Sequence, residues 1–316
     1  MKPNMSPETV VLITGCSSGL GLLIAESLAR KNYHVFATMR AVEDRNANTA
    51  HALRTLAKEE SLHLDVLELD VTDDASVERA VEAVIAQTGR IDVLINNAGY
   101  VLIGLTEACT LEQAQRIFDT NFFGPVRMNR AVLPHMRRHG SGLLIHVSSG
   151  AGRVGIPGLG LYSASKFALE ALTEAYRHEL ASQGIESAIV EPSAFVTPIF
   201  QKQDEAADTL RSSSYGPASE IPQNLRKQLT SSPLDPQEVA DCVVDLINLP
   251  VGERPLRVTV GLPVASWGGL NYFSEQLQKD VLIWAGNASL ARFQNKLNPV
   301  DLPEKLGDKR IFGINY

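Results

Sequence analysis

The sequence has little of what marks secreted, membrane-spanning or disulfide-bonded proteins. Its three cysteines, Cys16, Cys109 and Cys242, suggest neither a disulfide framework nor a metal site. No apolar run approaches the roughly 18 to 20 residues of a membrane span, and residues 1–9 lack the apolar core of a signal peptide. We therefore expect a cytoplasmic protein, in a reducing compartment, without a membrane span.

Basic charge and metal-ligand clusters are also scarce. The chain has 29 Lys and Arg against 36 Asp and Glu, a net charge of −7, which disfavours nucleic acid as a partner. His135 and His139 are one helical turn apart, but they flank Arg137 and Arg138 near an expected helix end, where cations complement the helix dipole. The sequence therefore predicts no metal site.

Short apolar runs alternate with segments of helical period along most of the 316 residues. The expected strands are residues 9–14, 34–38, 66–70, 93–96, 143–148, 187–191 and 257–260. The expected helices between them include residues 20–31, 74–88, 111–138, 162–183 and 236–249. This alternation predicts an α/β fold: a single Rossmann-type, doubly wound parallel sheet of about seven strands with helices on both faces.

Two regions break this alternation. Residues 198–235 are rich in Ser, Gln and Pro and follow the sixth expected strand. Because ligands bind beyond the carboxyl ends of the strands, this insertion is predicted to be a substrate lid, with a surface loop as the alternative. Residues 262–316 follow the last strand and are expected to form an extension that packs on the domain. The sequence leaves open whether this extension caps the site or forms an oligomer contact.

A glycine-rich loop, Thr14-Gly15-Cys16-Ser17-Ser18-Gly19-Leu20-Gly21, joins the first expected strand to the first expected helix. Glycines there permit a tight turn, a close approach to phosphate and close packing of helix on strand. The helix N-terminus offers N–H groups and a positive dipole end to a pyrophosphate. The loop therefore predicts a dinucleotide site formed by Gly15, Ser17, Ser18, Gly19, Leu20 and Gly21.

The end of the second strand bears on the choice of dinucleotide. An acidic residue there favours NAD, because it accepts hydrogen bonds from the ribose. This chain instead has Met39-Arg40, with no carboxylate before Glu43. The guanidinium of Arg40 can bind a 2′-phosphate, so NADP(H) is favoured over NAD(H). The alternative is a solvated surface arginine.

Tyr162 and Lys166 lie four residues apart in an expected helix, and Ser149 lies thirteen residues upstream of Tyr162, at the end of an expected strand. Residues spaced i,i+4 share one helix face. An ammonium beside a phenol stabilises the phenolate, so the tyrosine can act as an acid or base nearer neutrality. The hydroxyl of Ser149 can reach the same point from the sheet.

These motifs, together with Asn96-Asn97-Ala98-Gly99 after the fourth strand, resemble the short-chain dehydrogenase/reductase family over about residues 8–261. The sequences around Gly15, Arg40 and Tyr162 are most similar to the branch containing 17β-hydroxysteroid and retinol dehydrogenases. The resemblance implies an NADP-binding catalytic domain over residues 8–261, with 198–235 as its lid.

The resemblance also implies roles for individual residues. Asn121 matches an asparagine that holds a proton-relay water, and completes a catalytic set with Ser149, Tyr162 and Lys166. Further cofactor contacts are implied for Asp70, Val71, Asn97, Ala98, Gly99, Pro192, Val196 and Thr197, and for Tyr162 and Lys166 themselves. The chain departs from the family in one place, where Pro192-Ser193 replaces the usual Pro-Gly.

The implied function is an NADP(H)-dependent oxidoreductase, acting on CH–OH groups, that interconverts an apolar ketone or aldehyde and its alcohol. A homodimer or homotetramer is expected from the family. Two alternatives stay open. A non-catalytic NADP-binding sensor or scaffold often loses the Tyr or Lys, and both are retained here. A nucleotide-sugar epimerase or dehydratase usually has the loop T-G-x-x-G-x-x-G, whereas this loop reads T-G-x-x-x-G-x-G.

Overall fold

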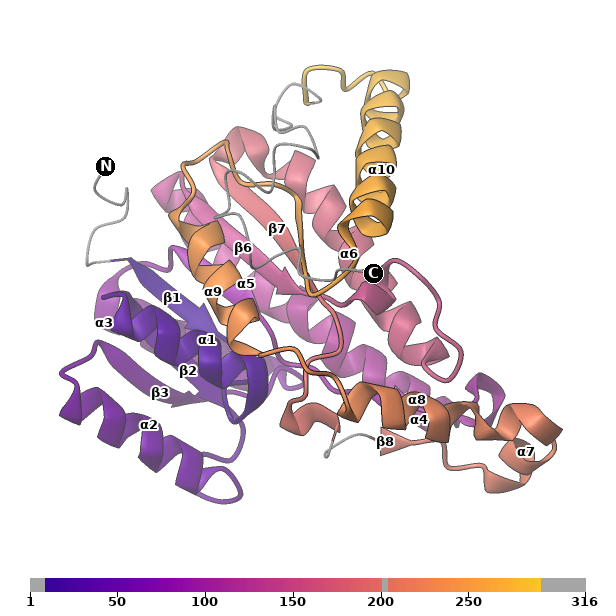
Figure 1. Cartoon of the computed structure of the whole chain (residues 1–316). Coiled ribbons are helices and arrows are strands. Elements are labelled where there is room, and N and C mark those ends of the chain that lie inside the picture. Colours follow the sequence, from indigo (N-terminus) through magenta and orange to yellow (C-terminus); the bar gives the residue numbers. More distant parts are fainter. Residues whose placement is uncertain (1–8, 201–203, 291–316) are drawn as a thin grey trace.

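The computed structural model describes residues 9–200 and 204–290. Within these residues, seven parallel strands form one sheet in the order β3-β2-β1-β4-β6-β7-β9 (Figure 1). The strands are β1 (Val10–Ile13), β2 (His34–Met39), β3 (Leu64–Glu68), β4 (Val93–Asn96), β6 (Gly142–Val147), β7 (Ile185–Pro192) and β9 (Arg257–Val260). The predicted doubly wound sheet is thereby confirmed, with its switch point at β1.

Helices cover both faces of the sheet. The main ones are α1 (Gly19–Arg30), α2 (Ala47–Glu59), α3 (Asp74–Thr88), α4 (Leu111–Phe118), α5 (Gly124–His139), α6 (Gly160–Glu179), α9 (Gln237–Asn248) and α10 (Val264–Trp284). Figure 1 shows α1, α2 and α9 on one face, while α3, α5 and α6 pack on the other. Helix α10 follows β9 in the chain and contacts it, and Figure 1 shows α10 projecting at one edge of the molecule.

The strand sequences explain the two layers. Successive side chains of a strand point to opposite faces. In β1, Val11 and Ile13 join the core beneath α1 and α9, while Val10 and Leu12 join the core beneath α3 and α5. All four residues are at most 2% exposed. A strand with helices on both sides is therefore apolar at every position, as this one is.

The segment predicted as one helix over 111–138 is interrupted. Helix α4 passes into a π-helical turn, η2 (Asp119–Phe123), before α5 begins at Gly124. Pro125 accounts for the interruption, because it has no N–H to donate to the carbonyl four residues earlier. That carbonyl belongs to Asn121, so the proline alters the helix at a predicted site residue.

The insertion 198–235 holds more regular structure than its composition predicts. It contains β8 (Asp204–Glu205), α7 (Thr209–Ser213) and α8 (Ile221–Thr230), with the 3-10 turns η5 (Pro198–Phe200) and η6 (Gly216–Glu220). Strand β8 pairs in parallel with β5 (Leu102–Ile103), outside the main sheet. The insertion is therefore anchored to the segment that follows β4.

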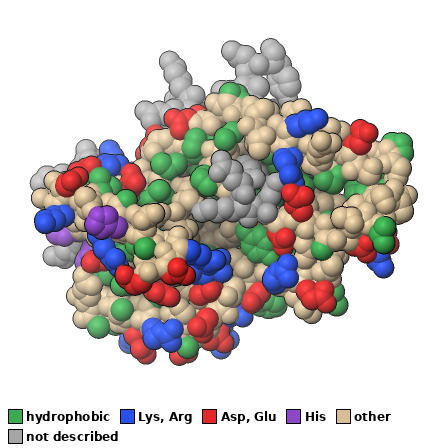
Figure 2. Space-filling model, turned by 90° about the horizontal axis from the view of Figure 1, so that it is seen from below, with side chains coloured by type: hydrophobic (Ala, Val, Ile, Leu, Met, Phe, Trp, Pro, Cys, Tyr) green, Lys and Arg blue, Asp and Glu red, His purple; other side chains and the backbone are tan. Residues whose placement is uncertain are grey.

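The remaining short elements are the 3-10 turns η1 (Thr106–Ala108), η3 (Gly150–Gly152) and η4 (Ala181–Gln183). Among the residues that the structure describes, no helix combines the length and the apolarity that crossing a bilayer requires. On the face shown in Figure 2, acidic and basic side chains are interspersed rather than gathered into a patch of one sign.

Candidate active site

A cavity of about 950 Å³ opens at the carboxyl ends of the strands around β1 and β4, where a doubly wound sheet binds its ligands. Most of the predicted site residues line it. They are Gly15, Ser17, Ser18, Gly19, Leu20, Arg40, Asp70, Val71, Asn97, Ala98, Gly99, Ser149, Tyr162, Lys166, Pro192 and Thr197. Residues more than 180 positions apart in the sequence thus meet around one space.

The glycine loop forms one end of this cavity. Gly15 has φ +76°, and a Cβ there would lie 2.7 Å from the Ala98 Cα, so only glycine fits between the two turns. Helix α1 then begins at Gly19 with no acidic residue in its first turn. Its positive dipole end is therefore not neutralised from within the helix, as an anion site requires.

Gly21 lies outside the cavity, although it was predicted to contact the cofactor. A Cβ at Gly21 would lie 2.4 Å from the Asn97 Nδ2 and from the Gly15 carbonyl oxygen. The Asn97 amide fills that space and donates to the carbonyls of Thr14, at 2.9 Å, and Gly15, at 3.2 Å. Gly21 therefore has a packing role. Because it has no side chain, the Asn97 amide fits beside it and its hydrogen bonds connect the glycine loop to the end of β4.

Arg40 lies at the end of β2 and lines the cavity beside Asp70. Its Nη1 is 3.5 Å from the Asp70 Oδ2, and about half of its side chain is exposed. Burial opposes ionisation of Asp70, but hydrogen bonds from Thr72 and the charge of Arg40 outweigh it and lower the pKa of Asp70. The guanidinium thus faces both a carboxylate and the open cavity.

Arg45 and Asn46 also line this end of the cavity and were not predicted. Both follow Arg40 in the loop between β2 and α2. The signal in the sequence was a second arginine only five residues after Arg40. The two arginines place two positive charges on the rim of the cavity, and guanidinium groups of this kind bind phosphate groups.

Ser149, Tyr162 and Lys166 line the cavity together. Ser149 follows β6, and its Oγ accepts a hydrogen bond from the Ala151 N–H at 3.1 Å. Lys166 donates from its Nζ to the Val147 carbonyl at 2.8 Å, and this Nζ lies 5.9 Å from the centre of the Tyr162 ring. The hydroxyl, the phenol and the ammonium predicted from spacing are therefore neighbours.

Burial shapes the proton affinities of this group. It raises the pKa of Tyr162 to about 12, opposed by a hydrogen bond with Ser149. Burial likewise lowers the pKa of Lys166 to about 8, opposed by the negative charge of Glu170. At neutral pH the phenol therefore holds its proton and the ammonium is charged. In this structure burial dominates the Tyr162 pKa, and the group that opposes it is Ser149 rather than the expected Lys166.

Asn121 lies behind the cavity wall and does not line it. Its side chain is 1% exposed, accepts from the Tyr100 N–H and donates to the Tyr100 carbonyl, both at 3.1 Å. It also donates to the Ser165 Oγ at 3.1 Å. A Cβ on Gly99 would lie 3.0 Å from the Asn121 Oδ1 and 3.8 Å from the Lys166 Nζ, so the three residues are packed together.

The far end of the cavity is mostly apolar. Its lining there includes Val101, Val154, Ile156, Leu159, Phe195, Ile199, Leu229, Leu262 and Trp267. Val196 lies outside the cavity and is 43% exposed, because it points away from the wall that Phe195 and Thr197 form. Leu262 and Trp267 come from the C-terminal extension and were not predicted, since their placement depends on tertiary packing.

The chain matches the sequence profile of a family described as short chain dehydrogenase over residues 9–208. Human retinol dehydrogenase 8 is 37% identical over 258 residues, covering 77% of this chain and 78% of that protein. Human 17-beta-hydroxysteroid dehydrogenase type 1 is 35% identical over 250 residues, covering 77% and 75%. The resemblance to these two dehydrogenases is thereby confirmed.

Solved structures agree. A short-chain dehydrogenase from Streptomyces avermitilis has a TM-score of 0.70 and 32% identity, covering 88% of this chain and 96% of that one. Actinorhodin polyketide ketoreductase, solved with NADPH, has a TM-score of 0.64 and 29% identity, covering 77% and 91%. With the matched profile spanning well over half of its length, the chain belongs to the short-chain dehydrogenase/reductase family of oxidoreductases.

Proposed function

We propose that this protein is an NADP(H)-dependent oxidoreductase that interconverts an apolar ketone or aldehyde and the corresponding alcohol. One observation carries the proposal. Ser149, Tyr162 and Lys166 line the same cavity as the glycine loop and Arg40. A proton donor and a dinucleotide cradle thus share one space, as hydride transfer to a carbonyl requires.

The residues present fit a nicotinamide dinucleotide. Gly15 lies so close to Ala98 that a Cβ would not fit between them. The backbone at the start of α1 therefore has no side chain from Gly15 over it and is open to a pyrophosphate. Arg40 and Arg45 would hold a 2′-phosphate, which supports NADP(H) over NAD(H). Asp70 and Val71 would border the adenine, and Thr197 the nicotinamide carboxamide. The bound cofactor would supply or accept the hydride.

The proton steps fall to the chain's own side chains. In reduction, Tyr162 gives its phenolic proton to the carbonyl oxygen as the carbon gains the hydride, and Ser149 donates a hydrogen bond to that oxygen. Lys166 supplies positive charge beside the phenolate that remains. Lys166 would then return a proton to the Tyr162 phenolate and regain one from a relay water held by Asn121. Oxidation of an alcohol follows the same path in reverse.

The apolar end of the cavity supports an apolar substrate. Phe195, Leu262 and Trp267 face it, and Ile199 and Leu229 come from the insertion 198–235, to which we assign the role of a substrate lid. Relatives named for retinol and for a hydroxysteroid are consistent with a substrate of that size and polarity. We propose retinoid-like or steroid-like carbonyl compounds as the first class to test.

Compartment and assembly are part of the same proposal. All three cysteines are free thiols, as a reducing cytoplasm maintains. Phe123 and Phe167 are 48% and 43% exposed, and aromatic side chains are enriched in subunit interfaces. We propose a homodimer or homotetramer, which light scattering of the purified full chain would measure.

The test is an NADPH-consumption screen over ketones and aldehydes of graded size, with NADH in parallel. The proposal expects turnover with NADPH, rising with apolar size until the cavity is filled. The same screen in Tyr162→Phe gives the background for each compound. The proposal would be overturned if none of the compounds were reduced. It would also be overturned if the wild type and Tyr162→Phe reduced them at equal rates.

A further inference from the structure

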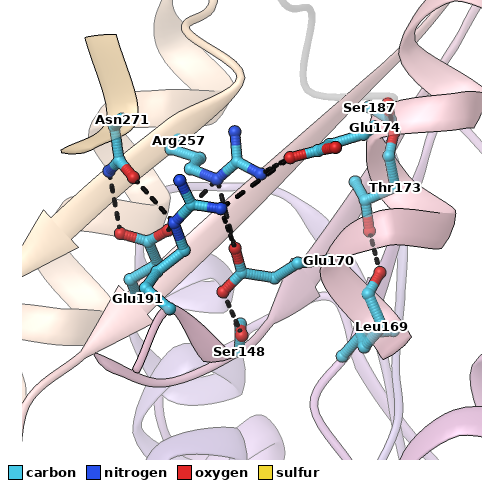
Figure 3. Close-up of polar contacts among 10 residues, drawn as sticks. Ser148, Leu169, Glu170, Thr173, Glu174, Ser187, Glu191, Arg257 and Asn271 are labelled. Atoms are coloured by element: carbon cyan, nitrogen blue, oxygen red, sulfur yellow. Dashed lines mark hydrogen bonds and ion pairs between the residues drawn. The ribbon is translucent and has the colours of Figure 1, made fainter. Parts of the chain in front are cut away.

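A network of buried charges lies beside Ser148, the residue that precedes Ser149 (Figure 3). Its carboxylates are Glu170, Glu174 and Glu191, and its guanidiniums are Arg153 and Arg257. The side chains of Glu170, Glu191 and Arg257 are at most 2% exposed. Burying so much charge is costly even when it is paired, so the network calls for a role beyond holding elements together.

Glu170 is the member nearest to the candidate active site. Its Oε1 accepts a hydrogen bond from the Ser148 Oγ at 2.7 Å, and its Oε2 accepts from the Arg257 Nε at 3.1 Å (Figure 3). Ser148 directly precedes Ser149 at the end of β6. A Cβ on Gly152 would lie 2.4 Å from the Glu170 Oε1, so the turn after Ser149 closes tightly over this carboxylate.

Lys166 and Glu170 are one turn apart on α6 and hold two successive residues, the last residue of β6 and the one directly after it. Lys166 donates to the Val147 carbonyl at 2.8 Å, and Glu170 accepts from the Ser148 hydroxyl. Helix α6 therefore carries Tyr162 and fixes the strand end that carries Ser149. A change at Glu170 would alter the distance between these two groups without touching either one.

Glu170 lies between the network and Lys166. It pairs with Arg257 on one side, and its negative charge acts on Lys166 on the other. The other titratable groups around Glu170 and Lys166 are Tyr162 and Glu174 on α6, His146 on β6, Glu191 on β7, Arg153 directly after η3, Arg257 on β9 and Glu275 on α10. Among these described neighbours, Lys166 is the cation one turn away on the same helix.

We propose that Glu170 is a positioning residue of the candidate active site, which holds the Ser148–Ser149 turn in place and keeps the Lys166 ammonium charged. The pKa of Lys166 is already lowered by burial, and Glu170 opposes that lowering. Burial raises the pKa of Glu191, as does the charge of Glu170. Burial also lowers the pKa of His146 to about 3. Among these groups, Glu170 is therefore the one whose charge supports the Lys166 ammonium.

The test measures the pKa of Lys166 directly, by NMR titration of the full chain with 13C-labelled lysine. The Lys166 signal is assigned by its loss in Lys166→Arg. Removing a nearby opposite charge shifts a pKa by about one unit or more, so Glu170→Gln should lower the Lys166 pKa by about one unit. An unchanged pKa in Glu170→Gln would overturn the proposal.

Glu174→Gln is the matched control. Glu174 forms an ion pair with the same Arg257 but lies one turn farther from Lys166 along α6, and neither its hydrogen bonds nor its ion pairs include Ser148. If the role of Glu170 were only to pair with Arg257, Glu170→Gln and Glu174→Gln would change the Lys166 pKa equally. The proposal expects the Lys166 pKa of Glu174→Gln to stay near that of the wild type. Equal shifts in the two variants would count against it.

Ser148→Ala tests the positional part and is less disruptive, since it leaves every ion pair intact. It should lower kcat by about tenfold with KM and the Lys166 pKa unchanged, because only the turn carrying Ser149 loosens. An unchanged kcat would refute this part, including in the case where Glu170→Gln fails to fold. The kcat readout rests on the proposed function, whereas the NMR titration needs no turnover, so the two proposals can fail separately.

Discussion

The two ends of the cavity are built in different ways. The end that holds Ser149, Tyr162 and Lys166 comes from β6 and α6, inside the regular sheet and helices, and its polar groups are tied to buried backbone. The apolar end is formed in part by the insertion 198–235 and by Leu262 and Trp267, beyond the regular alternation of strands and helices. In the function that we propose, proton chemistry and substrate choice therefore rest on different parts of the chain.

This difference suggests how the fold serves many substrates. A catalytic group works only within a narrow range of distances, so it belongs on rigid elements. An apolar wall needs only shape, and segments outside the sheet can change without disturbing the proton donor. Substitutions at the two ends should therefore have different kinetic signatures, which the following experiments compare.

The largest effect is expected at the polar end, for Tyr162→Phe. The variant keeps the ring but loses the proton donor, so kcat for carbonyl reduction should fall by about 10² to 10⁴-fold. NADPH binding, measured by fluorescence, should stay close to that of the wild type. Tyr33→Phe is the control, because its buried hydroxyl bonds to the Asn248 Oδ1 at 2.9 Å and lies away from the cavity. Comparable turnover in the two variants would remove Tyr162 from the proton-donor role.

The same contrast explains what could be predicted from the sequence. The glycine loop, Tyr162 and Lys166 were found because their chemistry fixes a spacing within one turn or one helix. Ser149 was found because it ends a strand. Such local rules need no knowledge of the rest of the fold.

Other features depend on tertiary packing and were missed. Helix α2 buries only Ala50 and Leu53, which is too weak a pattern to indicate a helix. Trp267 reaches the cavity only because α10 packs beside Gly150, whose Cβ would lie 3.6 Å from the Trp267 ring. Val196 was carried over from a motif, and the motif does not say which way a side chain in that loop points.

An intermediate effect is expected at the cofactor end, for Arg40→Asp. A hydrogen bond to a charged group contributes about 1.5–3 kcal/mol, so NADPH should bind about ten- to a hundredfold more weakly. NADH should bind no worse, since the carboxylate can accept from its ribose. The ratio of kcat/KM for the two cofactors measures this.

Arg54→Asp is the control for that ratio. Arg54 lies on α2, pairs with Glu43 and is exposed to a similar degree as Arg40, but it does not line the cavity. Its substitution changes the net charge of the protein equally and should leave the cofactor ratio near that of the wild type. A ratio that shifts equally in both variants would indicate a general charge effect instead of a 2′-phosphate site.

The smallest effect is expected at the apolar end, for Trp267→Ala. Losing an aromatic contact there should raise KM for large apolar carbonyl compounds by about tenfold, or ~1.4 kcal/mol, and leave small ketones unchanged. The kcat should change little, because the proton donor is untouched. Trp284→Ala, in the same helix but 86% exposed, should leave KM unchanged for all compounds.

Trp267→Phe then separates the apolar area of this side chain from its indole N–H group, because phenylalanine keeps an aromatic ring and has no N–H. The indole Nε1 is buried and, among the described residues, has no hydrogen-bond partner. If the wall is purely apolar, the phenyl ring should restore most of the affinity lost in Trp267→Ala. A loss as large as that of alanine would mean that the indole contributes something that an apolar ring of smaller size does not. If that contribution is a hydrogen bond from the N–H group, the apolar end contributes to orientation as well as to shape, and the contrast between the two ends is weaker than the lining suggests.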